Sequence, residues 1–121
     1  MRISRLRSVA TSSYLLSVIR YLEMNELKAF RELKCWKEAV ESRKYARLIM
    51  KQFPNDEKYR LTDQLIRSLR SVTNNIAEGF GRFHYQENIQ FCRHSRGSLT
   101  ETQDHFYCAF EDGYLKRNLK I

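Results

Sequence analysis

The strongest constraint on the fold is one run of apolar residues at helical spacing. Between positions 61 and 80 the apolar side chains recur at steps of four, four, three, four and four: Leu61, Leu65, Leu69, Val72, Ile76 and Phe80. At about 100° per residue these side chains fall within an arc of roughly 100° on an α-helix. The opposite side of that helix is polar. The run therefore predicts an amphipathic helix with one face packed against a core.

Two helices are expected before this run. The first covers residues 12–24, and the second covers residues 32–52. The apolar face of the first consists of Leu15, Val18, Ile19 and Leu22. The second must end near Phe53, because Pro54 disfavours the α conformation at the residue before it. With one proline and four glycines, the chain has little of the turn chemistry that an all-β protein needs.

One long helix is expected after the run, over residues 85–112, with Gly113 as its C-cap. The centre of its apolar face is predicted to consist of Ile89, Cys92, Leu99, Phe106 and Phe110. Arg96 and Gln103 fall inside the same arc, and a buried cation requires a partner. We predict that Arg96 pairs with Glu78 at the end of the preceding helix. The alternative is that the Arg96 side chain extends along the helix edge to reach solvent.

The charge of the chain suggests an anionic partner. Lys plus Arg outnumber Asp plus Glu by 22 to 14, which gives a formal net charge of +8 and favours nucleic acid, RNA or DNA. On the polar side of the 61–80 helix the residues predicted to contact a phosphate backbone are Arg60, Arg67, Arg70 and Asn74. An ordinary solvated helix face, with the excess charge serving solubility, is the alternative.

The remaining side chains offer no recognisable chemistry. Cys35, Cys92 and Cys108 are odd in number and widely spaced, which argues against a disulfide framework and favours a cytoplasmic protein. No stretch approaches the roughly 20 apolar residues of a membrane span. Glu101, His105 and Cys108 share one helix face but lack a fourth metal ligand. No nucleophile and base, and no phosphate-binding loop, can be matched. We expect no enzyme activity, no cofactor, no metal and no small-molecule substrate.

Three segments carry a family resemblance: FRELKCWKEAV at 30–40, NNIAEGFGR at 74–82 and FCRHSRGSLTE at 91–101. Together with Phe53-Pro54 they resemble the bacterial four-helix-bundle proteins encoded in 23S rRNA intervening sequences. The positions assigned to the family motif or to its structural support are Trp36, Asn75, Glu78, Gly79, Arg82, Arg96, Gly97, Ser98 and Glu101.

The resemblance implies an all-α fold, an antiparallel up-and-down helical bundle of three long helices, plus an N-terminal helix in this chain. It also implies a homo-oligomer, suspected to be a pentamer, without enzymatic activity. A related branch is the accessory variability protein of diversity-generating retroelements, in which a basic ring engages nucleic acid. The implied function is a scaffold that contacts RNA or a ribonucleoprotein. The alternative is a protein-binding adaptor with no nucleic-acid role.

The resemblance divides the chain into an N-terminal extension at 1–29, a family domain at 30–115 and a tail at 116–121. Two departures from the family are evident. Thr73 stands where proline is common. We also expect that the amphipathic helix that usually follows Gly113 in the family is missing here. We predict that the helix at 12–24 covers the apolar faces that the last helix normally covers. The alternative is a loose extension, with contacts between subunits covering the gap.

Overall fold

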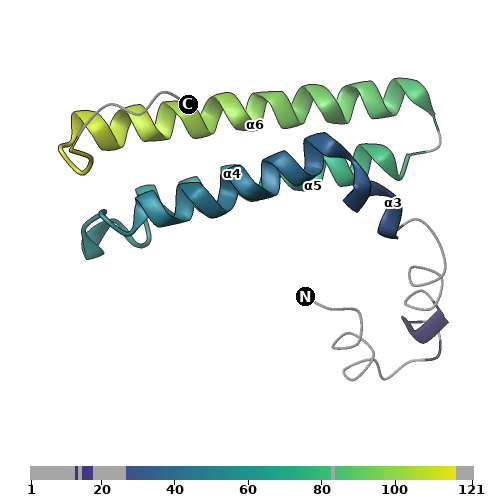
Figure 1. Cartoon of the computed structure of the whole chain (residues 1–121), viewed down its shortest axis with the longest axis horizontal. Coiled ribbons are helices and arrows are strands. Elements are labelled where there is room, and N and C mark those ends of the chain that lie inside the picture. The colour runs from purple at the N-terminus through teal and green to yellow at the C-terminus, as the bar shows by residue number, and fades with distance from the viewer. Residues whose placement is uncertain (1–12, 14, 18–26, 83, 117–121) are drawn as a thin grey trace.

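The structure is a computed structural model that describes residues 13, 15–17, 27–82 and 84–116 (Figure 1). The described helices are α3 (Leu27–Glu32), α4 (Lys34–Met50), the 3₁₀ helix η1 (Asn55–Glu57), α5 (Leu61–Phe80) and α6 (Tyr85–Glu111). The three long helices α4, α5 and α6 run antiparallel in sequence order, and this part of the chain contains no strand. The predicted all-α bundle is confirmed. None of its helices combines the length and the apolar character that a membrane span requires.

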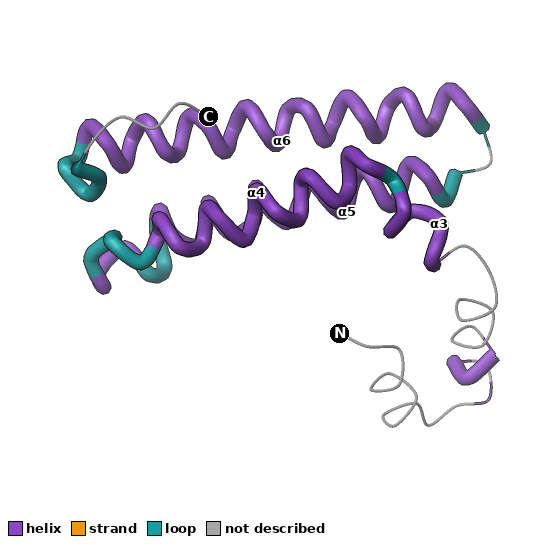
Figure 2. Tube along the Cα trace, in the orientation of Figure 1, coloured by secondary structure: helices purple, strands orange, loops and turns teal. Residues whose placement is uncertain are grey.

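The single helix predicted over 32–52 is wrong at its beginning, because the chain forms two helices there. Leu33 has an extended backbone, with φ −62° and ψ 127°, and separates α3 from α4. Figure 2 shows this break as a short loop between the two helices. The Phe30 and Trp36 rings meet edge to face across the break, with 5.5 Å between their centroids. This aromatic contact stabilises the turn between α3 and α4, which apolar periodicity does not reveal.

The core lies at the end of the bundle where α4 ends and α5 begins. Its buried members are Ala46, Met50, Phe53, Leu61, Leu65, Leu69, Phe106, Ala109 and Leu115. The Phe53 ring lies 6.5 Å from Phe106 and 5.9 Å from Tyr114, centroid to centroid. The segment between α4 and α5 and the segment after α6 therefore both close this end of the core.

Helices α5 and α6 contact each other through small and polar residues as well as through the apolar core. Thr102 Oγ1 donates to Ser68 Oγ at 2.8 Å, and both side chains are buried. The Ser71 and Ser98 hydroxyls lie 2.7 Å apart. Near the turn, a Cβ added to Gly79 would lie 2.8 Å from atoms of α6. Small side chains thus allow the two backbones to approach closely.

The predicted apolar face of α6 is corrected by this packing. Phe106 is buried as expected, but Cys92 is exposed, Leu99 is 42% exposed and Phe110 is 38% exposed. The face that packs on α5 is instead centred on Ser95, Thr102, Phe106 and Ala109. The hydroxyl groups find hydrogen-bond partners within the interface, so their burial is satisfied. Two of the core positions predicted on α6, Cys92 and Leu99, instead line an open groove.

The predicted pair between Glu78 and Arg96 is wrong. Glu78 pairs instead with Arg82, one turn later, at 3.3 Å. Ser95, the neighbour of Arg96, donates to the Val72 carbonyl, so Arg96 lies beside Val72 on α5. Glu78 is six residues further along α5, about 9 Å along the helix axis, which separates it from Arg96. The Arg96 side chain is exposed, which agrees with the alternative that it reaches solvent.

Most of the helix predicted at 12–24 lies outside the described residues. Within it, Ser13 and residues 15–17 are helical. The two described leucines, Leu15 and Leu16, are 42% and 39% exposed. The prediction that this segment covers the bundle stays a prediction.

Candidate nucleic-acid interface

A cluster of cations lies where α4 crosses α5. The lining of this basic cleft consists of Arg43, Lys44, Arg47, Arg70 and Asn74, around a volume of about 500 Å³. The first three residues come from α4 and the last two from α5. On α4 the three residues fall within an arc of about 100°, and on α5 the two residues are four positions apart, so the members on each helix share one face. Helix packing thus joins two short basic segments that lie far apart in the sequence.

Arg43 is the fixed member of the basic cleft. Its Nη1 donates a 2.7 Å hydrogen bond to Thr73 Oγ1, and the Thr73 hydroxyl donates to the Arg70 carbonyl at 3.0 Å. Thr73 is buried and Arg43 is half-buried. Thr73 therefore has a positioning role at the place where the family commonly has proline. The guanidinium group is held in place before any ligand arrives.

The electrostatics of the basic cleft favour an anion. Burial, and then the neighbouring charges of Arg47 and Arg70, lower the pKa of Arg43. An arginine nevertheless stays protonated at neutral pH, so three cations remain close together. Lys44 is compensated by Glu41 at 3.2 Å. Among the described residues no carboxylate forms an ion pair with Arg43, Arg47 or Arg70. A bound anion would relieve their mutual repulsion.

The four residues predicted to bind phosphate are separated by the structure. Arg70 and Asn74 line the basic cleft. Arg67 is engaged by Asp63, with 2.9 Å between Nε and Oδ2. Arg60 lies just before the first turn of α5, outside the helix. Only half of the predicted stripe therefore contributes to one site.

Sequence reasoning missed Arg43, Lys44 and Arg47. Lys44 and Arg47 follow Arg43 by one and four positions on a predicted helix, and cations at this spacing indicate a basic face. That signal does not reveal which part of α5 lies opposite. The contact between Arg43 and Thr73, 30 residues apart, supplies the missing register.

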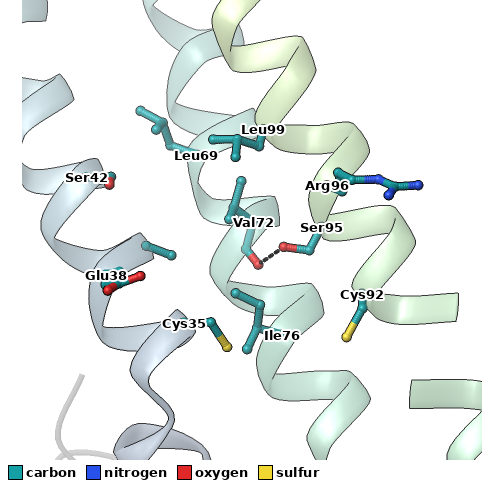
Figure 3. A pocket seen from close by; sticks show the side chains of 11 residues that line it. Cys35, Glu38, Ser42, Leu69, Val72, Ile76, Cys92, Ser95, Arg96 and Leu99 are labelled. Carbon is teal, nitrogen blue, oxygen red and sulfur yellow. Dashed lines mark hydrogen bonds between the residues drawn. The ribbon is translucent and has the colours of Figure 1, made fainter. Parts of the chain in front are cut away.

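A second concave surface lies on the other flank of α4. This apolar groove runs between α4 and α6 with α5 as its floor, and has a volume of about 420 Å³ (Figure 3). It is lined by Cys35, Glu38, Ala39, Ser42, Leu69, Val72, Ile76, Cys92, Ser95, Arg96 and Leu99. Figure 3 shows Cys35 and Cys92 at one end and the Arg96 guanidinium pointing away from the groove. The described residues thus leave part of the apolar faces of all three helices uncovered.

The motif residues of the sequence have mostly structural positions. Asn75 Nδ2 donates to the Ser71 carbonyl at 2.8 Å and to its hydroxyl at 3.0 Å, and Ser71 in turn contacts Ser98. Arg82 lies over the Phe91 ring, 4.8 Å from its centroid. Glu101 lies 3.2 Å from the His105 ring nitrogen. Asn75, Gly79, Arg82 and Ser98 therefore contribute to the packing of α5 against α6, whereas Glu101 is paired within α6. None of these residues lines the basic cleft.

Comparison with known proteins gives one result that covers most of the chain. The sequence model described as 23S rRNA-intervening sequence protein matches residues 31–120. No curated protein matches the sequence significantly. The match includes α4, α5 and α6 completely, together with both concave surfaces. The chain belongs to the 23S rRNA-intervening sequence protein family.

Proposed function

We propose that the protein is a non-enzymatic helical scaffold that binds RNA through its basic cleft. The observation that carries this proposal is the convergence of Arg43, Arg47 and Arg70 without a compensating carboxylate among the described residues. Guanidinium groups bind phosphate oxygens with two parallel hydrogen bonds, which suits them to nucleic-acid backbones. Asn74 adds a neutral hydrogen-bonding side chain at the edge of the same site. Binding of this kind positions a strand without reading its sequence.

The scaffold also self-associates, with a second copy of the chain covering the apolar groove. The groove exposes Leu99 and leaves Ile76 only half-buried, and uncovered apolar surface of this kind favours association. The family resemblance implies a homo-oligomer and suggests a pentamer. Self-association would bring several basic clefts onto one particle and increase its avidity for a long RNA.

The RNA proposal is tested by salt dependence. A protein that neutralises phosphates of a single strand loses affinity with salt, with a slope of about −0.7 for each phosphate contact. We expect replacement of Arg47 and Arg70 by Gln to weaken RNA binding and to reduce the slope by about 1.4. Fluorescence anisotropy with a labelled single-stranded RNA at several salt concentrations measures both quantities.

The matched control removes two positive charges from outside the basic cleft. Arg93 on α6 and Lys37 on α4 are exposed and do not line the basic cleft. Replacing these two by Gln should leave the slope nearly unchanged. An equal loss in both double variants would assign the affinity to net charge alone. Absence of any salt-dependent RNA binding would favour the second candidate, a protein-binding adaptor that uses the apolar groove.

A further inference from the structure

We infer that the basic cleft holds the terminal phosphate monoester of an RNA strand in preference to an internal phosphodiester. The inference deepens the proposed function and rests on it.

The basic cleft concentrates positive charge, because Arg47 and Arg70 lie near enough to Arg43 to lower its pKa. Its four cationic side chains surround a volume of about 500 Å³, and only Lys44 has a carboxylate partner among the described residues. A terminal phosphate monoester carries a charge of about −1.5 to −2 at neutral pH, whereas an internal phosphodiester carries a single charge. Each guanidinium gains more from the doubly charged group. Closely placed cations therefore discriminate in favour of a strand end.

The donors of the basic cleft come from two helices. Arg43 is tied to Thr73 through one Nη1 hydrogen, which leaves its other N–H donors available. Arg47 and Arg70 approach from different helices, and Asn74 lies one turn beyond Arg70. A monoester presents three terminal oxygens, one more than a diester, to donors that converge from two sides.

The positive lining ends on one side of the basic cleft and continues on the other. Toward α3 the next residues on the same faces are Val40 on α4 and Ala77 on α5, both half-buried. In the opposite direction Lys51 is exposed one turn after Arg47 on α4. On α5 the next cation is Arg67, which is paired with Asp63, and exposed Arg60 follows just before the helix. A strand whose end is held in the cleft would leave along these cations. A strand passing through would lose its charge contacts at Val40 and Ala77.

The test compares three versions of one short single-stranded RNA: with a 5′-phosphate, with a 3′-phosphate, and with hydroxyl groups at both ends. The full chain is titrated with each by fluorescence anisotropy, using an internal label. We expect a phosphorylated RNA to bind about tenfold more tightly than the hydroxyl-ended RNA, equivalent to about 1.4 kcal/mol. A preference for one of the two phosphorylated ends would support the inference and assign the strand polarity.

Single variants locate the effect. Arg70→Gln and Arg47→Gln should abolish most of the tenfold preference, while Arg60→Gln should weaken all three RNAs and keep the preference. Arg93→Gln on α6 is the matched control and should change neither. Equal affinity of the wild-type chain for all three RNAs would overturn the inference and leave the proposed function intact. A preference that persists in Arg70→Gln would overturn its assignment to the basic cleft, and failure to bind any RNA would overturn the proposed function itself.

Discussion

The Tyr114 hydroxyl donates a hydrogen bond of 2.7 Å to Glu57 Oε1 across 57 residues of sequence. The other oxygen of the same carboxylate, Oε2, accepts a 3.1 Å hydrogen bond from the Leu61 amide at the start of α5. Arg60, which precedes α5, makes no side-chain capping hydrogen bond. Glu57 therefore caps α5 from the 3₁₀ helix η1 and joins it to the segment after α6.

This arrangement predicts a specific acid sensitivity. The hydrogen bond from Tyr114, and then the one from Leu61, lower the pKa of Glu57. A carboxylate with a lowered pKa in the folded state contributes stability above its unfolded value of about 4.3. That contribution disappears as the pH falls through the folded value. Thermal unfolding followed by circular dichroism should show a lower Tm for Glu57→Gln at neutral pH and a shallower decline of Tm in acid.

The phenol gives a second test of the same contact. Glu57 raises the pKa of Tyr114 to about 12, so its contribution is complete below the unfolded pKa of about 10 and is lost as the pH rises toward the folded value. Tyr114→Phe should lower the Tm at neutral pH, and its effect should add only partly to that of Glu57→Gln, because the two substitutions share the contact between Tyr114 and Glu57 but only the second also changes the cap on Leu61. Tyr107→Phe, at an exposed tyrosine of α6, is the control. Equal effects of the two tyrosine substitutions would contradict the assignment.

Gly79 provides a prediction about the close contact between α5 and α6. A Cβ at this position would lie 2.8 Å from both Asn88 Oδ1 and Phe91 Cβ. Gly79→Ala should therefore destabilise the protein by about 1 to 3 kcal/mol through overpacking. Gly97→Ala is the matched control in α6, where the added Cβ has no neighbour within 4 Å beyond the adjacent backbone of its own helix. There the substitution should stabilise the helix by about 0.5 to 1 kcal/mol. Urea denaturation measures both, and a stabilising Gly79→Ala would refute the contact.

The sequence was sufficient for the architecture because α5 combines a regular apolar stripe with a polar opposite side. Leu61, Leu65, Leu69 and Val72 are all buried as predicted. The same reasoning failed in part on α6, because two of its four buried residues carry hydroxyl groups that bond across the interface. A pattern of apolar residues treats Ser95 and Thr102 as surface, although both are buried.

The candidate site was only half predictable for a different reason. Spacing along one helix identifies a face, and Arg70 and Asn74 were found in this way. The partner face on α4 depends on helix register, and no periodicity within a single helix contains that information. Arg67 is a case in which the sequence alone would have been sufficient. Asp63 lies four positions before it, and such a pair on one helix face reduces the positive charge available to a ligand.

Thr102 should contribute measurably to the free energy of unfolding through its contacts between α5 and α6. It is 2% exposed, and its hydroxyl lies 2.8 Å from Ser68 Oγ and 2.9 Å from the Ser98 carbonyl. Thr102→Val keeps the shape and removes the hydrogen bond, which should cost about 1 kcal/mol. The control is Thr100→Val, because Thr100 is exposed and bonds only within its own helix. A Thr102→Val protein as stable as the wild type in urea would contradict this contribution.

The apolar groove is expected to be the surface through which copies of the chain associate. Leu99 lines the groove and is 42% exposed, while Leu48 is 59% exposed on α4 and is not part of the groove lining. If a second copy covers the groove, Leu99→Glu buries an unpaired charge on association, and the penalty is several kcal/mol. Light scattering coupled to size exclusion should then show an assembly for the wild type and for Leu48→Glu, and monomers for Leu99→Glu. Circular dichroism checks that each variant is folded. An assembly that persists in folded Leu99→Glu would mean that copies of the chain associate through another surface.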